Sequence, residues 1–149
     1  MDCADGEWLR KQGNEFGSTT GRPRRCGWID LAALRYAAQI NGFDALAVTK
    51  LDVLTGLERI KVCLGYRDAS GNHLDVPPSN HEELGSLEPD YVELDGWSDD
   101  LTSIRSIEEL PVPARKLLSK IEKVLDIPVE MVSVGPGREE TIVVSGALV

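Results

Sequence analysis

One short loop of this sequence concentrates side chains that bind anions. Residues 18–25 read Ser-Thr-Thr-Gly-Arg-Pro-Arg-Arg, which brings hydroxyl groups, a glycine and three guanidinium groups together. Guanidinium groups bind carboxylate and phosphate bidentately, and the backbone N–H groups of a glycine turn add further donors. Pro23 restricts one backbone dihedral between two of the arginines. The loop therefore predicts a binding site for a small anion, and the alternative is a solvated basic loop.

A second group of candidate residues follows a predicted strand. Residues 45–48 form a continuous apolar run, which is typical of a fully buried parallel strand, and Thr49, Lys50, Leu51 and Asp52 come next. Ligands of open α/β sheets bind at the carboxyl ends of strands. One carboxylate can accept from both N1–H and N2–H₂ of guanine, a pairing that adenine cannot make. Asp52 therefore predicts guanine recognition, and the alternative is a strand end with solvated charges.

A third candidate segment, Ser133-Val-Gly-Pro-Gly-Arg138, leaves another predicted strand through a Gly-Pro-Gly turn. Its backbone can line a purine pocket, although a tight turn between two strands is the favoured alternative.

The remaining reactive residue types predict no catalytic or metal site. Cys3, Cys26 and Cys63 show no CxxC spacing, so we expect reduced thiols, with Cys26 and Cys63 as buried structural residues. His73 and His81 lie in a polar segment without partners at catalytic or metal-binding spacing, and we expect both at the surface.

Helices and strands that position these residues follow from periodicity. Residues 12–27 are expected to form a loop, followed by a helix over 30–40 with Asp30 near its N-terminus and Asn41-Gly42 at its end. A strand is expected over 60–66. Residues 72–103 are interpreted as a surface connection with one short strand over 91–94.

The C-terminal part adds a helix and two strands. Ser106 precedes Glu109 at the spacing of a capping box, and an apolar face predicts a helix over 113–125. Strands are expected over 128–132 and 141–144. The fold class predicted from these elements is α/β with mostly parallel strands flanked by helices.

Composition limits the function further. The chain has 149 residues, 42% hydrophobic and 28% charged, which suits one globular domain. Its net charge of -9 argues against a general nucleic-acid binder, and no apolar run is long enough to span a membrane. The N-terminus lacks the pattern of a signal peptide, which favours the cytoplasm. Because the chain as a whole is acidic, the local cluster of arginines suggests a small anionic ligand.

A phosphate-binding motif is missing from this sequence. It contains no GxxxxGK[ST] loop and no Ser/His/Asp or Cys/His set. A nucleotide site without phosphate-binding residues is incomplete, so we expect the chain to be part of something larger.

Three blocks in this order resemble the C-terminal portion of adenylosuccinate synthetase. They are residues 13–28, residues 49–54 with 60–63, and residues 133–139, and the segment 91–97 is similar too. The likeness runs from about residue 7 to residue 144. Residues 1–6 are interpreted as a candidate non-family start within a single region, 1–149. The resemblance implies the C-terminal part of a P-loop-NTPase-like sheet.

The resemblance also implies roles for individual residues. The family forms adenylosuccinate from IMP, L-aspartate and GTP with Mg²⁺, a step of AMP synthesis. An aspartate-binding loop is implied, in which Arg22 also reaches IMP and Arg24 also reaches GTP. Guanine recognition is implied for residues 50–52 and residues 133–135. The implied substrate-binding residues are Ser18, Thr19, Thr20, Gly21, Arg22, Pro23 and Arg24, and the implied GTP-binding residues are Arg24, Lys50, Leu51, Asp52, Ser133, Val134 and Gly135.

The family's phosphate loop, catalytic Asp and His and magnesium ligands have no counterpart in this sequence, so it is expected to carry no catalytic or metal-binding residue. We expect the chain to be inactive alone, and the intact enzyme to be a cytoplasmic homodimer with no nucleic-acid or membrane partner. The alternative is a non-catalytic guanine-nucleotide-binding or interaction module.

Overall fold

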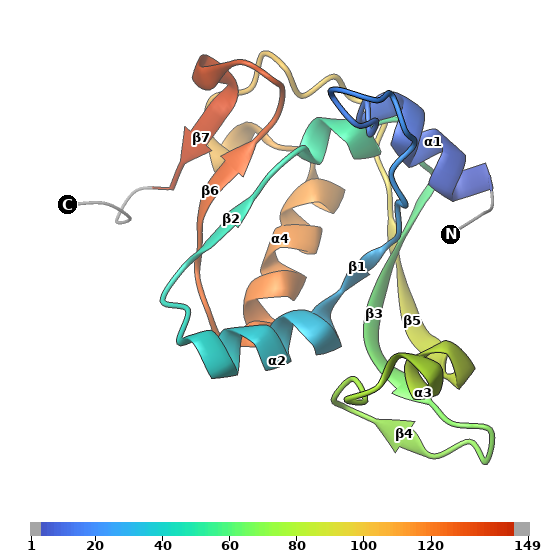
Figure 1. The fold of residues 1–149 in the computed structure, drawn as a ribbon. Coiled ribbons are helices and arrows are strands. Elements are labelled where there is room, and N and C mark those ends of the chain that lie inside the picture. Colours follow the sequence, from blue (N-terminus) through green and yellow to red (C-terminus); the bar gives the residue numbers. More distant parts are fainter. Residues whose placement is uncertain (1–3, 145–149) are drawn as a thin grey trace.

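Two small sheets flank one long amphipathic helix in the computed structural model, which describes residues 4–144 (Figure 1). The first sheet has four strands, and the long strand β3 lies at its centre and pairs with each of the other three. Its members are β1 (Ile29–Asp30), β3 (Arg59–Arg67), β4 (His73–Leu74) and β5 (Glu88–Asp95). The second sheet has three strands, in the order β2 (Leu46–Val48), β6 (Val129–Ser133) and β7 (Thr141–Val143).

The strand directions correct the expectation of a mostly parallel sheet. Only β1–β3 and β2–β6 are parallel among the described pairings, whereas β3–β4, β3–β5 and β6–β7 are antiparallel. A parallel connection needs a crossover of a dozen or more residues. The chain between β6 and β7 is too short for that, and a turn after Arg67 returns the chain directly to β4. The mixed α/β class is confirmed, but the mostly parallel arrangement is wrong.

Helix α2 (Leu31–Asn41) forms as its sequence predicts. Asp30 Oδ1 accepts a hydrogen bond of 2.9 Å from the backbone N–H of Ala33, which satisfies one of the free donors of the first turn. Gly42 ends the helix at φ +65°, a left-handed conformation that glycine adopts without steric cost. Both ends of the helix are therefore determined by local chemistry.

Helix α4 (Val112–Leu125) supplies the central buried face. Leu117, Leu118, Ile121 and Leu125 pack into the main core together with residues of β3, β6 and the segment before the helix. Full burial of such side chains stabilises a fold by about 1.5–3 kcal/mol each. The helix predicted over 113–125 is confirmed.

The capping box predicted at Ser106 and Glu109 is wrong. Ser106 makes no side-chain capping bond, and the turn after it is a 3-10 helix, η2 (Ile107–Glu109). Glu109 Oε2 instead accepts from the backbone N–H of Arg105 at 3.1 Å. Pro111 explains the difference, because a proline disfavours helical backbone in the residue before it and separates this turn from α4.

Several elements were under-predicted. Helix α1 (Ala4–Gln12) had no counterpart in the sequence prediction, and the surface connection contains helix α3 (His81–Ser86) as well as β4. Strand β5 spans eight residues rather than four, because it pairs along almost the whole length of β3. Strand β2 is half-buried with Ala47 exposed, so its expected full burial is wrong.

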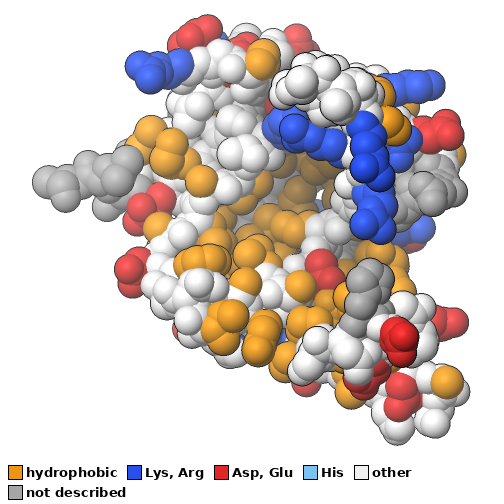
Figure 2. All heavy atoms as spheres, viewed as in Figure 1, with side chains coloured by type: hydrophobic (Ala, Val, Ile, Leu, Met, Phe, Trp, Pro, Cys, Tyr) orange, Lys and Arg blue, Asp and Glu red, His pale blue; other side chains and the backbone are white. Residues whose placement is uncertain are grey.

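Strand edges on the two sheets face a common hollow. Within residues 4–144, β1 pairs only with β3 and β2 pairs only with β6, so each has one free edge. Figure 1 shows these strands on opposite sides of α4, and Figure 2 shows hydrophobic side chains exposed in the hollow between them.

Candidate functional site

Two parallel strands bring Lys50 and Ser133 together. Val48 of β2 is in register with Val132 of β6, so the carboxyl ends of both strands lie side by side. Lys50 adopts a left-handed conformation (φ +61°), and its backbone N–H donates to Ser133 Oγ at 2.7 Å. The structure therefore joins two sequence blocks that are 83 positions apart.

Asp52 lies one turn further, in the 3-10 helix η1 (Leu51–Leu54). Its Oδ1 atom is buried and has no hydrogen-bond partner among the described residues. Burial raises the pKa of this carboxyl group, and the nearby Glu140 carboxylate raises it further while Lys50 opposes the shift. A buried acceptor without a donor is costly, and a ligand N–H group would remove that cost.

The turn after β6 is closed on itself by Glu140. Its backbone carbonyl accepts from the N–H of Val134 at 2.8 Å, and its carboxylate accepts from the N–H of Gly137. A Cβ atom at Gly135 would lie 2.5 Å from the carboxylate carbon of Glu140, so a side chain there would displace this carboxylate from its present position. The turn therefore depends on Glu140, whose importance the sequence prediction missed.

Two of the predicted guanine-site residues belong to the core. Leu51 is 2% exposed and Val134 is fully buried, and both pack in the main cluster. Their side chains hold η1 and the turn in place, and neither residue is open to solvent in this structure. The polar groups at this edge come from Lys50, Asp52 and Ser133.

The arginine-rich loop is an exposed hairpin. The N–H of Gly17 donates to the carbonyl of Arg22 at 2.8 Å, and the N–H of Arg24 donates to the carbonyl of Glu15 at 2.9 Å. Gly21 adopts φ +65° at the tip. Ser18 to Arg25 are all exposed to solvent. Figure 2 shows Lys and Arg side chains gathered along one rim of the hollow, over the N-terminal part of the chain.

Glu15 connects this hairpin to the guanine-site candidates. One carboxylate oxygen pairs with Arg24 Nη1 at 3.1 Å, and the other pairs with Lys50 Nζ. Lys50 Nζ also donates to the carbonyl of Gly13 at 2.8 Å. The hydrogen bond and charge of Lys50, with Arg24 adding to them, hold the pKa of Glu15 below its usual value. Sequence reasoning missed this link because nothing in the local pattern pairs residues 35 positions apart.

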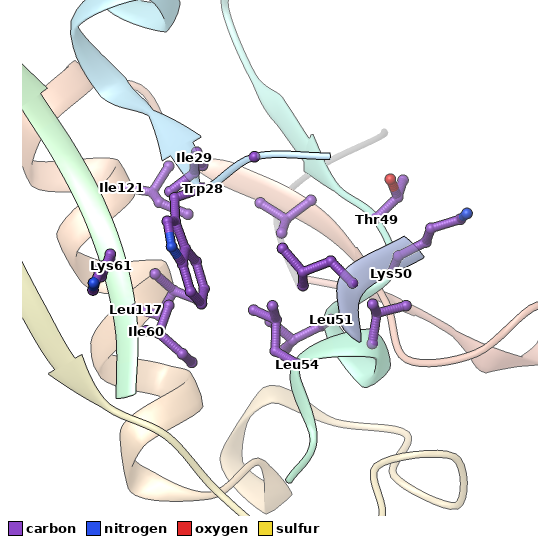
Figure 3. A pocket seen from close by; sticks show the side chains of 14 residues that line it. Trp28, Ile29, Thr49, Lys50, Leu51, Leu54, Ile60, Lys61, Leu117 and Ile121 are labelled. Atoms are coloured by element: carbon purple, nitrogen blue, oxygen red, sulfur yellow. The ribbon is translucent and has the colours of Figure 1, made fainter. Parts of the chain in front are cut away.

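The hollow beside this site contains an apolar cavity of about 240 Å³ (Figure 3). Trp28 and Ile29 lie on one wall, and Leu51 and Leu54 lie on the opposite wall. Trp28 Nε1 is buried and has no hydrogen-bond partner among the described residues. Lys50 lies at the rim, so the cavity adjoins the polar site without containing Asp52.

The cysteine and histidine predictions are settled only in part. Cys63 is buried, and burial raises the pKa of its thiol. Cys26 is only partly buried, so its expected burial is wrong, and Cys3 lies outside the described residues. His73 is exposed and lies 3.2 Å from Asp75 Oδ1. The structure describes the backbone of His81 but not the surroundings of its side chain.

Residues 4–144 contain neither a candidate metal-binding cluster nor a helix that could span a membrane. No group of three or more His, Cys, Asp or Glu residues is placed to hold a metal ion. None of the helices in that range has the length and apolar character needed to cross a bilayer.

Comparisons with known proteins agree with the resemblance seen in the sequence. The family model for adenylosuccinate synthetase matches residues 1–142. The adenylosuccinate synthetase of Carboxydothermus hydrogenoformans is 54% identical over 138 residues, and that of Hahella chejuensis is 49% identical over 137 residues. These matches cover 93% and 92% of this chain but only 32% of each relative, so the chain spans about a third of their length.

A solved structure gives the same result. The fully ligated adenylosuccinate synthetase from Plasmodium falciparum superimposes with a TM-score of 0.94 at 39% identity, over 97% of this chain and 35% of that chain. A family model that matches almost the whole sequence and a solved structure with the same fold lead to one conclusion. This chain belongs to the adenylosuccinate synthetase family.

Proposed function

We propose that this chain supplies the aspartate-binding loop and the guanine-recognition elements for the GTP-dependent ligation of IMP and L-aspartate to adenylosuccinate. In this proposal, Ser18 to Arg24 bind the L-aspartate carboxylates, Arg22 also contacts IMP, and Arg24 also contacts GTP. Lys50 to Asp52 and Ser133 to Gly135 enclose the guanine base. GTP is a co-substrate, and Mg²⁺ acts through residues outside this sequence.

The orphaned acceptor of Asp52 carries the guanine assignment. Its Oδ1 atom is buried and unpaired among the described residues, and Asp52 follows two positions after Lys50, whose N–H donates to Ser133 Oγ. Guanine presents adjacent N1–H and N2–H₂ donors to such a carboxylate, whereas adenine presents an acceptor at N1. A site built around these bonds discriminates strongly, because the wrong base leaves its buried polar groups unpaired.

The remaining chemistry requires other family residues. Strands β1 and β2 leave free edges on either side of the apolar hollow, which supports packing of further family sequence there. We infer that the two sheets form part of the larger P-loop-NTPase-like sheet. The family likeness also supports a cytoplasmic homodimer as the complete enzyme, with no nucleic-acid or membrane partner.

Calorimetric titration of the purified chain with GDP tests the guanine assignment, with ADP as the matched control. We expect GDP to bind more tightly than ADP. Equal binding of both nucleotides, or no binding by a chain that circular dichroism shows to be folded, would contradict guanine recognition by this chain alone.

A coupled assay tests whether this chain needs other family residues to form adenylosuccinate. We expect no adenylosuccinate from this chain with GTP, IMP, L-aspartate and Mg²⁺. Co-expression with the first two thirds of the Carboxydothermus hydrogenoformans enzyme should restore product formation. Product from this chain alone would refute the proposal that it needs other residues. Guanine-selective binding with no restored activity would favour the alternative, a non-catalytic nucleotide-binding module.

A further inference from the structure

Glu15 contacts both proposed recognition segments. Its carboxylate lies between the guanidinium of Arg24 at 3.1 Å and the ammonium of Lys50. Its backbone carbonyl accepts from the N–H of Arg24 at 2.9 Å, so it also closes the base of the hairpin. The Glu15 side chain is 23% exposed, which makes it less hydrated than the two cations it joins.

The cations themselves have few other restraints. Arg24 is anchored through its backbone, because its carbonyl accepts from Arg10 Nε at 2.9 Å, but Glu15 is the residue that orients its guanidinium. Lys50 Nζ has one further acceptor, the carbonyl of Gly13. An extended side chain with free rotamers binds weakly until it is oriented, because binding must then also fix it.

From these contacts we propose that Glu15 is a positioning residue that couples the arginine loop to the guanine-recognition segment. The proposal rests on the proposed function for the identity of the ligands, but the contact itself does not. Through Glu15, order at the Lys50–Ser133 junction is transmitted to the hairpin, so that the two segments present their cations in one arrangement.

A purely electrostatic role and a positioning role of Glu15 predict opposite changes in GDP affinity when its charge is removed. Glu15 places a negative charge between two cations, so Glu15→Gln makes the local site more positive. If charge alone mattered, the anionic ligand GDP would bind more tightly to this variant. A positioning role predicts weaker binding, because Lys50 and Arg24 lose their fixed orientation.

Hydrogen exchange of the full chain without ligand tests the coupling directly. Glu15→Gln should speed exchange by about 3- to 10-fold at the amides of Gly17 and Arg24, and also at the amide of Lys50, which lies on the other side of the link. This range corresponds to the loss of one or two exposed ion pairs. Unchanged exchange at Lys50 would overturn the coupling, whether or not the chain binds nucleotide.

GDP titration of the same proteins gives the second readout. In the unsubstituted chain, GDP should slow exchange in both the hairpin and residues 50–53. In Glu15→Gln the slowing should be confined to residues 50–53, with GDP affinity reduced by about 3- to 10-fold. Tighter GDP binding, or slowing that still reaches the hairpin, would overturn the proposal.

Two further variants separate the position of Glu15 from a general effect of its charge. Glu58→Gln removes the same charge at an exposed site and should leave exchange and affinity unchanged. Glu15→Asp keeps the charge on a shorter side chain and should give intermediate values. Failure of the guanine assignment would appear separately, as equal binding of GDP and ADP to the unsubstituted chain.

Discussion

The two proposed recognition segments are held in place by different forces. The segment at Lys50 to Asp52 is attached to the core, because Leu51 is buried beside residues of α4 and β6. The hairpin over residues 15–24 has no side chain in that cluster and is held by backbone hydrogen bonds and two exposed ion pairs. Truncation of the buried Leu51 side chain should therefore cost folding free energy, whereas changes in the hairpin should alter binding and leave the fold intact.

The largest expected effect is a loss of stability in the segment that is attached to the core. Leu51→Ala should lower the free energy of unfolding by about 2–5 kcal/mol, because it removes a buried side chain and leaves a cavity. Chemical denaturation measures the change. Ile40→Ala is the matched control, since Ile40 is 65% exposed and its truncation should change stability by less than about 0.5 kcal/mol. Equal effects of both variants would contradict the proposed core attachment.

A second variant separates binding from folding within the same segment. Asp52→Asn should weaken GDP binding by about 1–3 kcal/mol, the size of a lost bidentate base contact. Its stability should not fall, because the buried Oδ1 atom makes no bond that the substitution would break. Calorimetry gives the affinity, and Asp44→Asn, at an exposed position, is the control. Unchanged GDP affinity in Asp52→Asn would remove the main support for guanine recognition.

Lowering the pH should also weaken GDP binding, because it protonates Asp52. The pKa of Asp52 is raised by burial, so the ionised form that guanine needs is lost at a higher pH than for an ordinary Asp. GDP affinity should therefore start to fall at a higher pH than the titration of an ordinary Asp would give. The contribution of Asp52 to stability has the opposite sign: it is present at low pH and is lost as pH rises through its folded pKa. An Asp52→Asn variant with the same pH dependence of binding would contradict this assignment.

In the hairpin, loss of an ion pair should have only a small effect on stability. Arg24→Ala removes an exposed ion pair and should change the free energy of unfolding by about 1 kcal/mol or less. In the co-expressed enzyme, the same change should raise the KM for L-aspartate, because one guanidinium donor is lost. Arg25→Ala is the control, since Arg25 makes no ion pair among residues 4–144 and lies outside the proposed set. A loss of stability as large as that of Leu51→Ala would erase the distinction between the two segments.

Local chemistry in the sequence was sufficient to predict several elements and the family. The cap at Asp30, the left-handed Gly42 and the apolar face of α4 each depend on residues within a few positions of one another. The three sequence blocks identify the family because each keeps its residue types at short, fixed spacing. These predictions needed no knowledge of distant contacts.

Other features depend on contacts between distant residues, so only the tertiary structure decided them. The full length of β5 and the antiparallel pairings follow from which strand edges meet. Glu15 meets Lys50 across 35 positions, and Lys50 meets Ser133 across 83. Periodicity and spacing report the conformation of a short segment. The position of one segment beside another is determined by the packing of the whole core. For this reason the sequence named the candidate recognition residues but not the Glu15 carboxylate, which joins Arg24 to Lys50.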